Sequence, residues 1–132
     1  MDQALEERLH VYEREGLASP AIVAFTRETL HWLEETARHP CTEESAGFFA
    51  SHLMLALARI ERGEELGDNW DASVHEQAEE LKALQPWAES IRARAQKQLG
   101  LALPPQELDF IVIHLGSFML HYNDPLLSHI AE

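Results

Sequence analysis

Residues 105–121 read PQELDFIVIHLGSFMLH, and the part from Leu108 to Leu120 is the most hydrophobic stretch of the chain. Pro104 and Pro105 come just before it, and proline suits the first turn of a helix because amides there have no partner within the helix. A helix that is apolar on nearly every side is buried. The stretch therefore predicts a central helix that forms the core or also contacts a partner.

Helical spacing extends over most of the remaining sequence. Apolar residues recur three or four positions apart in four further segments, each bounded by capping residues or helix breakers. The predicted helices span residues 2–15, 20–38, 42–62 and 74–99. Pro86 predicts a kink or break in the last of these, residues 63–70 predict a surface loop, and Asn123-Asp124-Pro125 predict a break before a final short turn. No segment alternates like a strand, so the predicted fold class is all-α, a bundle of five helices.

The composition bounds the class of protein. With 132 residues, 45% of them hydrophobic, residues 1–132 predict a single domain with its own core. The chain has 10 Lys and Arg against 23 Asp and Glu, a net charge of −13. This charge repels phosphate backbones and anionic lipids, so we expect no direct binding of nucleic acid. Lone Cys41, the absence of a signal peptide and the absence of a bilayer-spanning segment favour a soluble cytoplasmic protein without membrane attachment.

Two pairs of residues with ionisable side chains have the same spacing. His52 and Arg59 lie seven positions apart in one predicted helix, and Glu107 and His114 lie seven apart in another. Seven residues make almost two helical turns, so each pair shares a helix face. If the two helices pack antiparallel, Arg59 falls opposite Glu107 and His52 falls opposite His114.

These residues admit two interpretations. A histidine on an apolar helix face is commonly a structural group with a satisfied hydrogen bond. Alternatively, because Arg59 discourages a second positive charge on His52, the pair suits a bound anion or a phosphorylated imidazole. His114 and His121 lack the further ligands that a metal site needs, and no nucleotide-binding or hydrolase motif is present. The sequence therefore predicts no catalytic residue, no metal and no cofactor.

Three runs occur in a fixed order: His52-Leu53 through Ala58-Arg59 to Gly63, Leu81-Lys82 through Pro86 to Ala88, and Pro105-Gln106-Glu107 through Phe110-Ile111 to His114-Leu115. In this order and spacing they resemble a known family, the PTS regulation domain (PRD) of bacterial sugar-responsive regulators.

The resemblance implies a five-helix bundle that is usually dimeric and whose histidines accept phosphate from the phosphoenolpyruvate-dependent sugar phosphotransferase system. His52 and His114 match its two histidine positions, and Arg59 and Glu107 match charged positions around them. Many family members have aspartate where Ser51 stands and Asn-Pro where Asn69-Trp70 stands. Related regulators commonly carry two such domains and a nucleic-acid-binding module, whereas these residues make a lone domain.

We therefore expect a regulatory domain, a homodimer that senses the phosphotransferase system through its phosphocarrier and acts on a separate regulator by protein contact. It would have no catalysis of its own beyond receiving a phosphoryl group. Two alternatives stay open. One is a module that binds a small molecule or anion through Arg59, His52 and His114. The other is an accessory subunit that docks its last helix onto another protein without phosphorylation.

Overall fold

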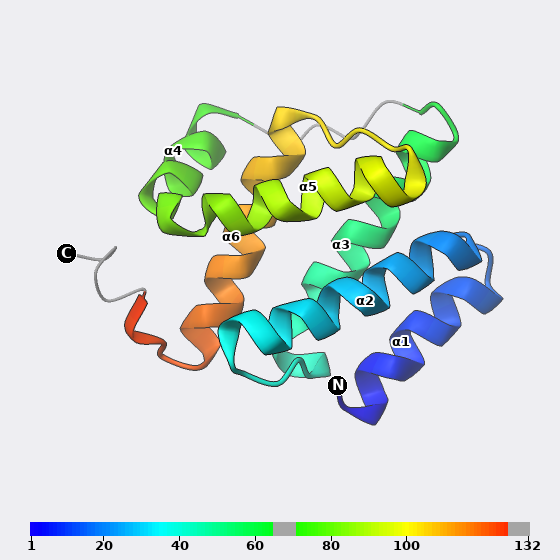
Figure 1. Cartoon of the computed structure of the whole chain (residues 1–132), viewed down its shortest axis with the longest axis horizontal. Coiled ribbons are helices and arrows are strands. Elements are labelled where there is room, and N and C mark those ends of the chain that lie inside the picture. The colour runs from blue at the N-terminus through cyan, green and yellow to red at the C-terminus, as the bar shows by residue number, and fades with distance from the viewer. Residues whose placement is uncertain (65–70, 127–132) are drawn as a thin grey trace.

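The computed structural model describes residues 1–64 and 71–126, and within these ranges every regular element is helical. The described residues form six α-helices, with one short 3₁₀ helix between the fourth and the fifth, and Figure 1 shows how they are arranged. They are α1 (Gln3–Arg14), α2 (Pro20–Ala37), α3 (Glu43–Glu61), α4 (Ala72–Glu80), η1 (Lys82–Leu84), α5 (Gln85–Leu99) and α6 (Pro105–His121).

The all-α prediction is confirmed, and the predicted helix over 74–99 is broken as Pro86 indicates, but the break begins at Leu81, before the proline. Because α4, η1 and α5 are separate elements, the described ranges hold six α-helices rather than five. Pro86 lies in the first turn of α5, where its missing amide removes no hydrogen bond. Most of the predicted loop at 63–70, and most of the predicted final turn, lie outside the described residues.

Two predicted helix starts are confirmed by their caps. The Ser19 hydroxyl accepts a hydrogen bond from the amide of Ile22, and the Thr42 hydroxyl accepts one from the amide of Ser45. Ser45 returns the interaction, because its hydroxyl accepts from the Thr42 amide at 2.9 Å. These bonds satisfy amides that the helices themselves leave without partners.

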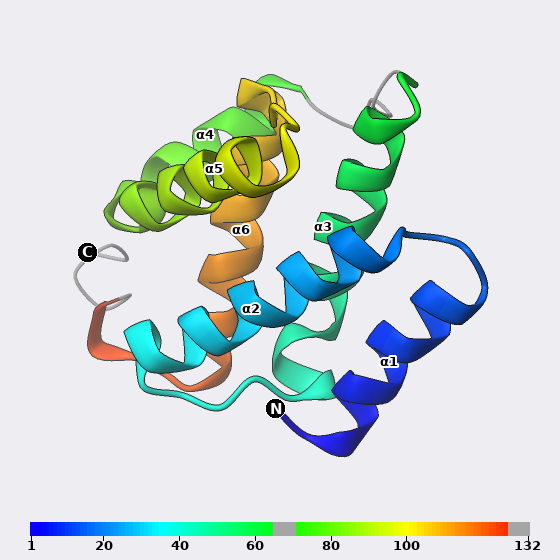
Figure 2. The ribbon, with the colours of Figure 1, turned by 45° about the vertical axis from the view of Figure 1, so that its right-hand side comes forward.

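The centre of the molecule is the contact between α3 and α6, which run in opposite directions (Figures 1 and 2). Helices α1 and α2 pack against α3, and α4 and α5 pack against α6. Leu53 and Leu57 of α3 and Ile111, Leu115 and Phe118 of α6 are each at most 1% exposed. The prediction that the most hydrophobic stretch forms a central helix is therefore confirmed.

The last turn of α6 is attached to the connection between α2 and α3. The hydroxyl of Tyr122 donates a hydrogen bond to the carbonyl oxygen of Pro40, and the Tyr122 ring stacks on His39 with 4.4 Å between ring centres. Nε2 of His39 lies 2.7 Å from Oδ2 of Asp124. These contacts fix where α6 ends relative to the start of α3.

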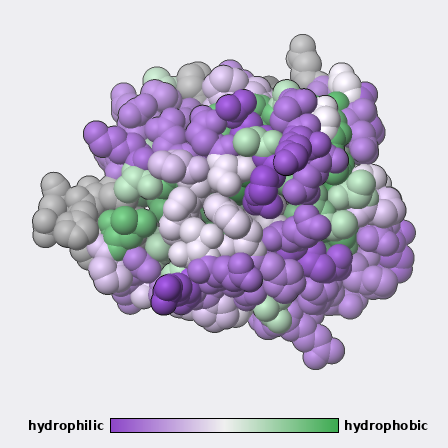
Figure 3. Space-filling model, in the orientation of Figure 1, coloured by the Kyte–Doolittle hydropathy of each residue, from purple (hydrophilic) through white to green (hydrophobic). Residues whose placement is uncertain are grey.

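The surface agrees with the acidic composition. Hydrophilic residues cover most of the face in Figure 3, and hydrophobic residues appear there only in small separate areas. In residues 1–64 and 71–126, no helix is both long enough and apolar enough to cross a membrane. Two large apolar side chains of the central helices are exposed nonetheless, Phe48 of α3 at 80% and Leu120 of α6 at 64%.

We predict that Tyr122→Phe lowers the free energy of unfolding by about 0.5–1.5 kcal/mol, the usual net value of one hydrogen bond. Tyr122→Ala should cost more, because it also removes the ring stacked on His39. Urea unfolding followed by circular dichroism measures both. Equal stability of the wild type and Tyr122→Phe would contradict a role for the hydroxyl.

Candidate functional site

A histidine and a buried carboxylate join the two central helices. Nε2 of His52, on α3, lies 2.6 Å from Oε1 of Glu107, in the first turn of α6. A carboxylate only accepts hydrogen bonds, so Nε2 carries the proton and donates. Glu107 is 5% exposed, whereas the His52 side chain is 30% exposed. The bond gives the buried carboxylate a partner and fixes the orientation of the imidazole ring.

The second candidate histidine lies directly beside the first. The ring centres of His52 and His114 are 4.9 Å apart. Phe110 lies 5.4 Å from the His52 ring, and Phe49 lies 6.3 Å from the His114 ring. The two imidazoles therefore meet between aromatic side chains of α3 and α6.

This environment keeps His114 neutral at neutral pH. Burial, with a smaller contribution from the nearby His52 ring, lowers the pKa of His114 to about 4, and Glu107 opposes the change. A neutral imidazole has a free electron pair on one ring nitrogen, which is the form that acts as a nucleophile or a base.

Two other residues that the sequence singled out lie elsewhere. Arg59 is exposed, and Glu107 bonds to His52 rather than to Arg59. The central helices are antiparallel, but their register places His52 between Glu107 and His114, so the expected opposition of Arg59 and Glu107 does not occur. Ser51 is buried on another side of α3, where it lies 2.6 Å from Nη1 of Arg8. Asn69-Trp70 lies outside the described residues.

A narrow groove beside the histidine pair leads to His114. It lies between the first turns of α3 and the last turns of α6, and its volume is about 250 Å³. Its lining consists of acidic, hydroxyl, aromatic and imidazole side chains: Glu44, Ser45, Phe48, Phe49, His114, Ser117 and His121. Of the residues predicted from the sequence, only His114 lines it.

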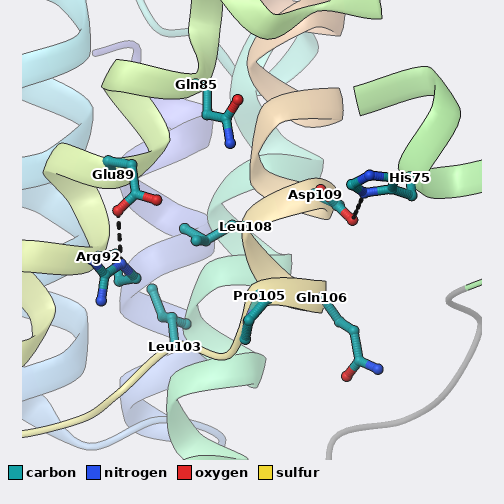
Figure 4. A pocket seen from close by; sticks show the side chains of 9 residues that line it. All are labelled: His75, Gln85, Glu89, Arg92, Leu103, Pro105, Gln106, Leu108 and Asp109. Carbon is teal, nitrogen blue, oxygen red and sulfur yellow. Dashed lines mark hydrogen bonds and ion pairs between the residues drawn. The ribbon is translucent and has the colours of Figure 1, made fainter. Parts of the chain in front are cut away.

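A larger pocket of about 710 Å³ lies at the other end of α6, bordered by α4 and α5 (Figure 4). Glu89 and Arg92 form an ion pair at one side, and His75 bonds to Asp109 at the other, with 3.0 Å between Nδ1 and the carboxylate oxygen. The Asp109 carboxylate raises the pKa of His75. Leucine and proline side chains lie between the two pairs: Leu103, Leu108 and Pro105.

Neither the groove nor the larger pocket is predicted from the sequence. The larger pocket draws its residues from α4, α5, α6 and the segment before α6, and those residues form no motif in the sequence. The one sequence signal of the groove is the seven-residue spacing of His114 and His121, which points to a metal site rather than to a groove. Among the described residues, no three His, Cys, Asp or Glu side chains converge where they could hold a metal ion.

The fold and the site define an all-helical protein with a glutamate–histidine pair and a second, neutral histidine where its central helices meet. No protein-family model, no curated protein and no solved structure matches the chain. The site can accept a proton or an electrophilic group on an imidazole nitrogen, and Glu107 can orient His52 for that step.

We predict that the His114 ring titrates near pH 4 in the folded protein, far below its ordinary value of 6.5. His52→Ala should raise this pKa, because it removes a neighbouring positive charge and exposes the ring to more solvent. Ring chemical shifts measured by NMR across the pH range test both statements. A wild-type midpoint near 6.5 would contradict the first.

The same group makes stability depend on pH. The unfolded chain binds a proton at this histidine near pH 6.5, whereas the folded chain binds it only near pH 4, so folding loses stability as the pH falls through this window. We predict that the free energy of unfolding of His114→Gln decreases less over this pH range than that of the wild type. Unfolding measured at a series of pH values tests this. Parallel curves would show that His114 does not contribute.

Proposed function

We propose that this chain is a cytoplasmic regulatory domain that receives a phosphoryl group on His52 or His114. The donor would be a phosphocarrier of the sugar phosphotransferase system. The observation that carries the proposal is the placement of two imidazoles 4.9 Å apart, one of them held by a buried carboxylate, between the central helices. The sequence resemblance to PTS regulation domains is the reason for proposing a phosphocarrier as the donor. The domain itself has no catalytic function in this proposal.

The geometry supports a mechanism for the switch. A phosphoryl group adds roughly two negative charges to an imidazole. Glu107 is 5% exposed and bonds to His52, so solvent screens its charge only weakly. Repulsion between the phosphoryl group and this carboxylate would therefore weaken the central helix contact.

The output in this proposal is a change in protein contacts. Phe48 and Leu120 are exposed apolar residues on the two helices whose packing would change, which supports a surface that contacts a second copy of the chain. The net charge of −13 disfavours direct contact with nucleic acid. In this proposal a separate regulator protein therefore binds the altered dimer.

The test is phosphorylation of the purified protein by phosphoenolpyruvate, the general phosphotransferase enzyme and its phosphocarrier. We expect intact mass spectrometry to detect one acid-labile phosphoryl group and not two, because phosphates on rings 4.9 Å apart repel each other strongly. A variant with both His52→Ala and His114→Ala should gain none, and His10→Ala, an exposed histidine on α1, should behave as the wild type.

An unchanged wild-type mass would refute the phosphoryl switch and leave the ligand-binding and accessory alternatives. Modification of the doubly substituted variant would place the phosphate elsewhere and would also refute it.

A second measurement tests the role of Glu107. Phosphorylation should lower the melting temperature of the wild type, and it should lower that of Glu107→Gln less, because the amide carries no charge to repel the phosphate. Differential scanning calorimetry of phosphorylated and unphosphorylated forms gives both differences. Equal differences in the two proteins would argue against repulsion by Glu107.

A further inference from the structure

Building on the proposed function, we infer that His114 is the histidine that carries the phosphoryl group, and that Ser117 and His121 hold this group in the groove between α3 and α6.

Helix α6 carries a stripe of polar and aromatic residues along one side, although it is the most hydrophobic helix of the chain. The stripe consists of Glu107, Phe110, His114, Ser117 and His121, which follow one another at steps of three and four residues. Such steps place side chains on one helix face. The buried end of the stripe contacts His52, and its other end lines the groove.

The two histidines differ in their surroundings. His114 lines the groove, whereas His52 does not line it although the His52 side chain is 30% exposed. Nε2 of His52 is bonded to Glu107, and its ring lies against those of Phe110 and His114. At about 250 Å³ the groove is smaller than most sites for organic ligands, which occupy roughly 300–1,000 Å³. A phosphoryl group attached to His114 is small enough to fit.

The free hydrogen-bond donors of the groove belong to α6. On α3, the amide of Ser45 donates to the Thr42 hydroxyl, and the Ser45 hydroxyl donates to the carbonyl oxygen of Pro40 at 3.4 Å. Ser117 and His121 are exposed, and in the part of the chain that the structure describes their side chains make no hydrogen bond. The hydroxyl and the imidazole are therefore available to donate to phosphate oxygens.

The charges around the pair also favour His114. A phosphoryl group on His52 would lie on the same ring that bonds to the Glu107 carboxylate at 2.6 Å, whereas one on His114 lies one ring farther from it, in the groove. At this range the carboxylate still repels the phosphoryl group, as the proposed switch requires. Glu44 is the one carboxylate in the lining of the groove, and it is exposed. It opposes phosphorylation, and water screens its charge.

The transfer balances without an oxidant or a reductant. The free electron pair of the neutral His114 ring attacks the phosphorus of the phosphohistidine on the carrier. A new nitrogen–phosphorus bond forms as the bond in the carrier breaks, and the carrier nitrogen keeps that electron pair and takes up a proton. The phosphorylated His114 ring releases a proton to water.

The experiment equilibrates each variant with phosphorylated carrier at neutral pH and measures the phosphorylated fraction by intact mass under alkaline conditions. We expect His52→Gln to accept phosphate and His114→Gln to accept none. Ser117→Ala and His121→Gln should each lower the equilibrium constant for transfer about tenfold, the usual effect of one hydrogen bond to a charged group. Glu44→Gln should raise it. Ser90→Ala on α5 and His10→Gln on α1 are the matched controls.

The outcomes separate this inference from the proposed function. Phosphate on His114→Gln but not on His52→Gln would overturn the inference and keep the phosphoryl switch, whereas an unmodified wild type would overturn both. Equal transfer constants for Ser117→Ala, His121→Gln and the controls would overturn the role of the groove. Peptide mapping of the phosphorylated wild type identifies the modified histidine directly, so a variant that fails to fold does not decide the result.

Discussion

The hydrogen bond between His52 and Glu107 is the interaction on which the centre of this molecule depends. A carboxylate that is 5% exposed needs a partner, because an ionised group without one is costly to remove from water. The only hydrogen bond described for this side chain in residues 1–64 and 71–126 crosses from α6 to α3. The apolar core sets the distance between the two helices, and this bond favours a single register for them. The neighbouring position of His114 follows from that register.

Local chemistry made most of the fold predictable. Ser19 and Thr42 act as caps because a short hydroxyl side chain can reach the free amides of a first turn, and this depends only on nearby residues. The break between α4 and α5 was harder to locate. Proline disfavours a helical conformation in the residue before it, yet Pro86 lies in the first turn of α5. The helix before it has already ended at Leu81, whose side chain packs beside Gly116 of α6. Where that helix ends depends on tertiary packing, which a proline rule does not contain.

The sequence predicts which residues belong to the site, but not which of them bond to one another. Seven-residue spacings placed His52, Glu107 and His114 on the correct faces, because helical geometry fixes which residues share a face. The spacing does not fix how far one helix slides along another, so Arg59 was expected beside Glu107 and lies exposed instead. Ser117 belongs to no recognisable motif, the spacing of His121 from His114 indicates nothing about a groove, and the proximity of both to α3 depends on how the two helices end.

The stacked rings of His39 and Tyr122 have a mechanical consequence. They attach the last turn of α6 to the segment between α2 and α3, while the first turn of α6 lies roughly 25 Å away along the helix axis, from a rise of about 1.5 Å per residue. Pro105 and Gln106, which line the larger pocket, therefore lie at the end of α6 that the Tyr122 contacts do not reach, and at that end the Glu107–His52 bond joins α6 to α3. Helix α6 is thus attached to the rest of the protein at both ends, once beside the groove and once beside the larger pocket.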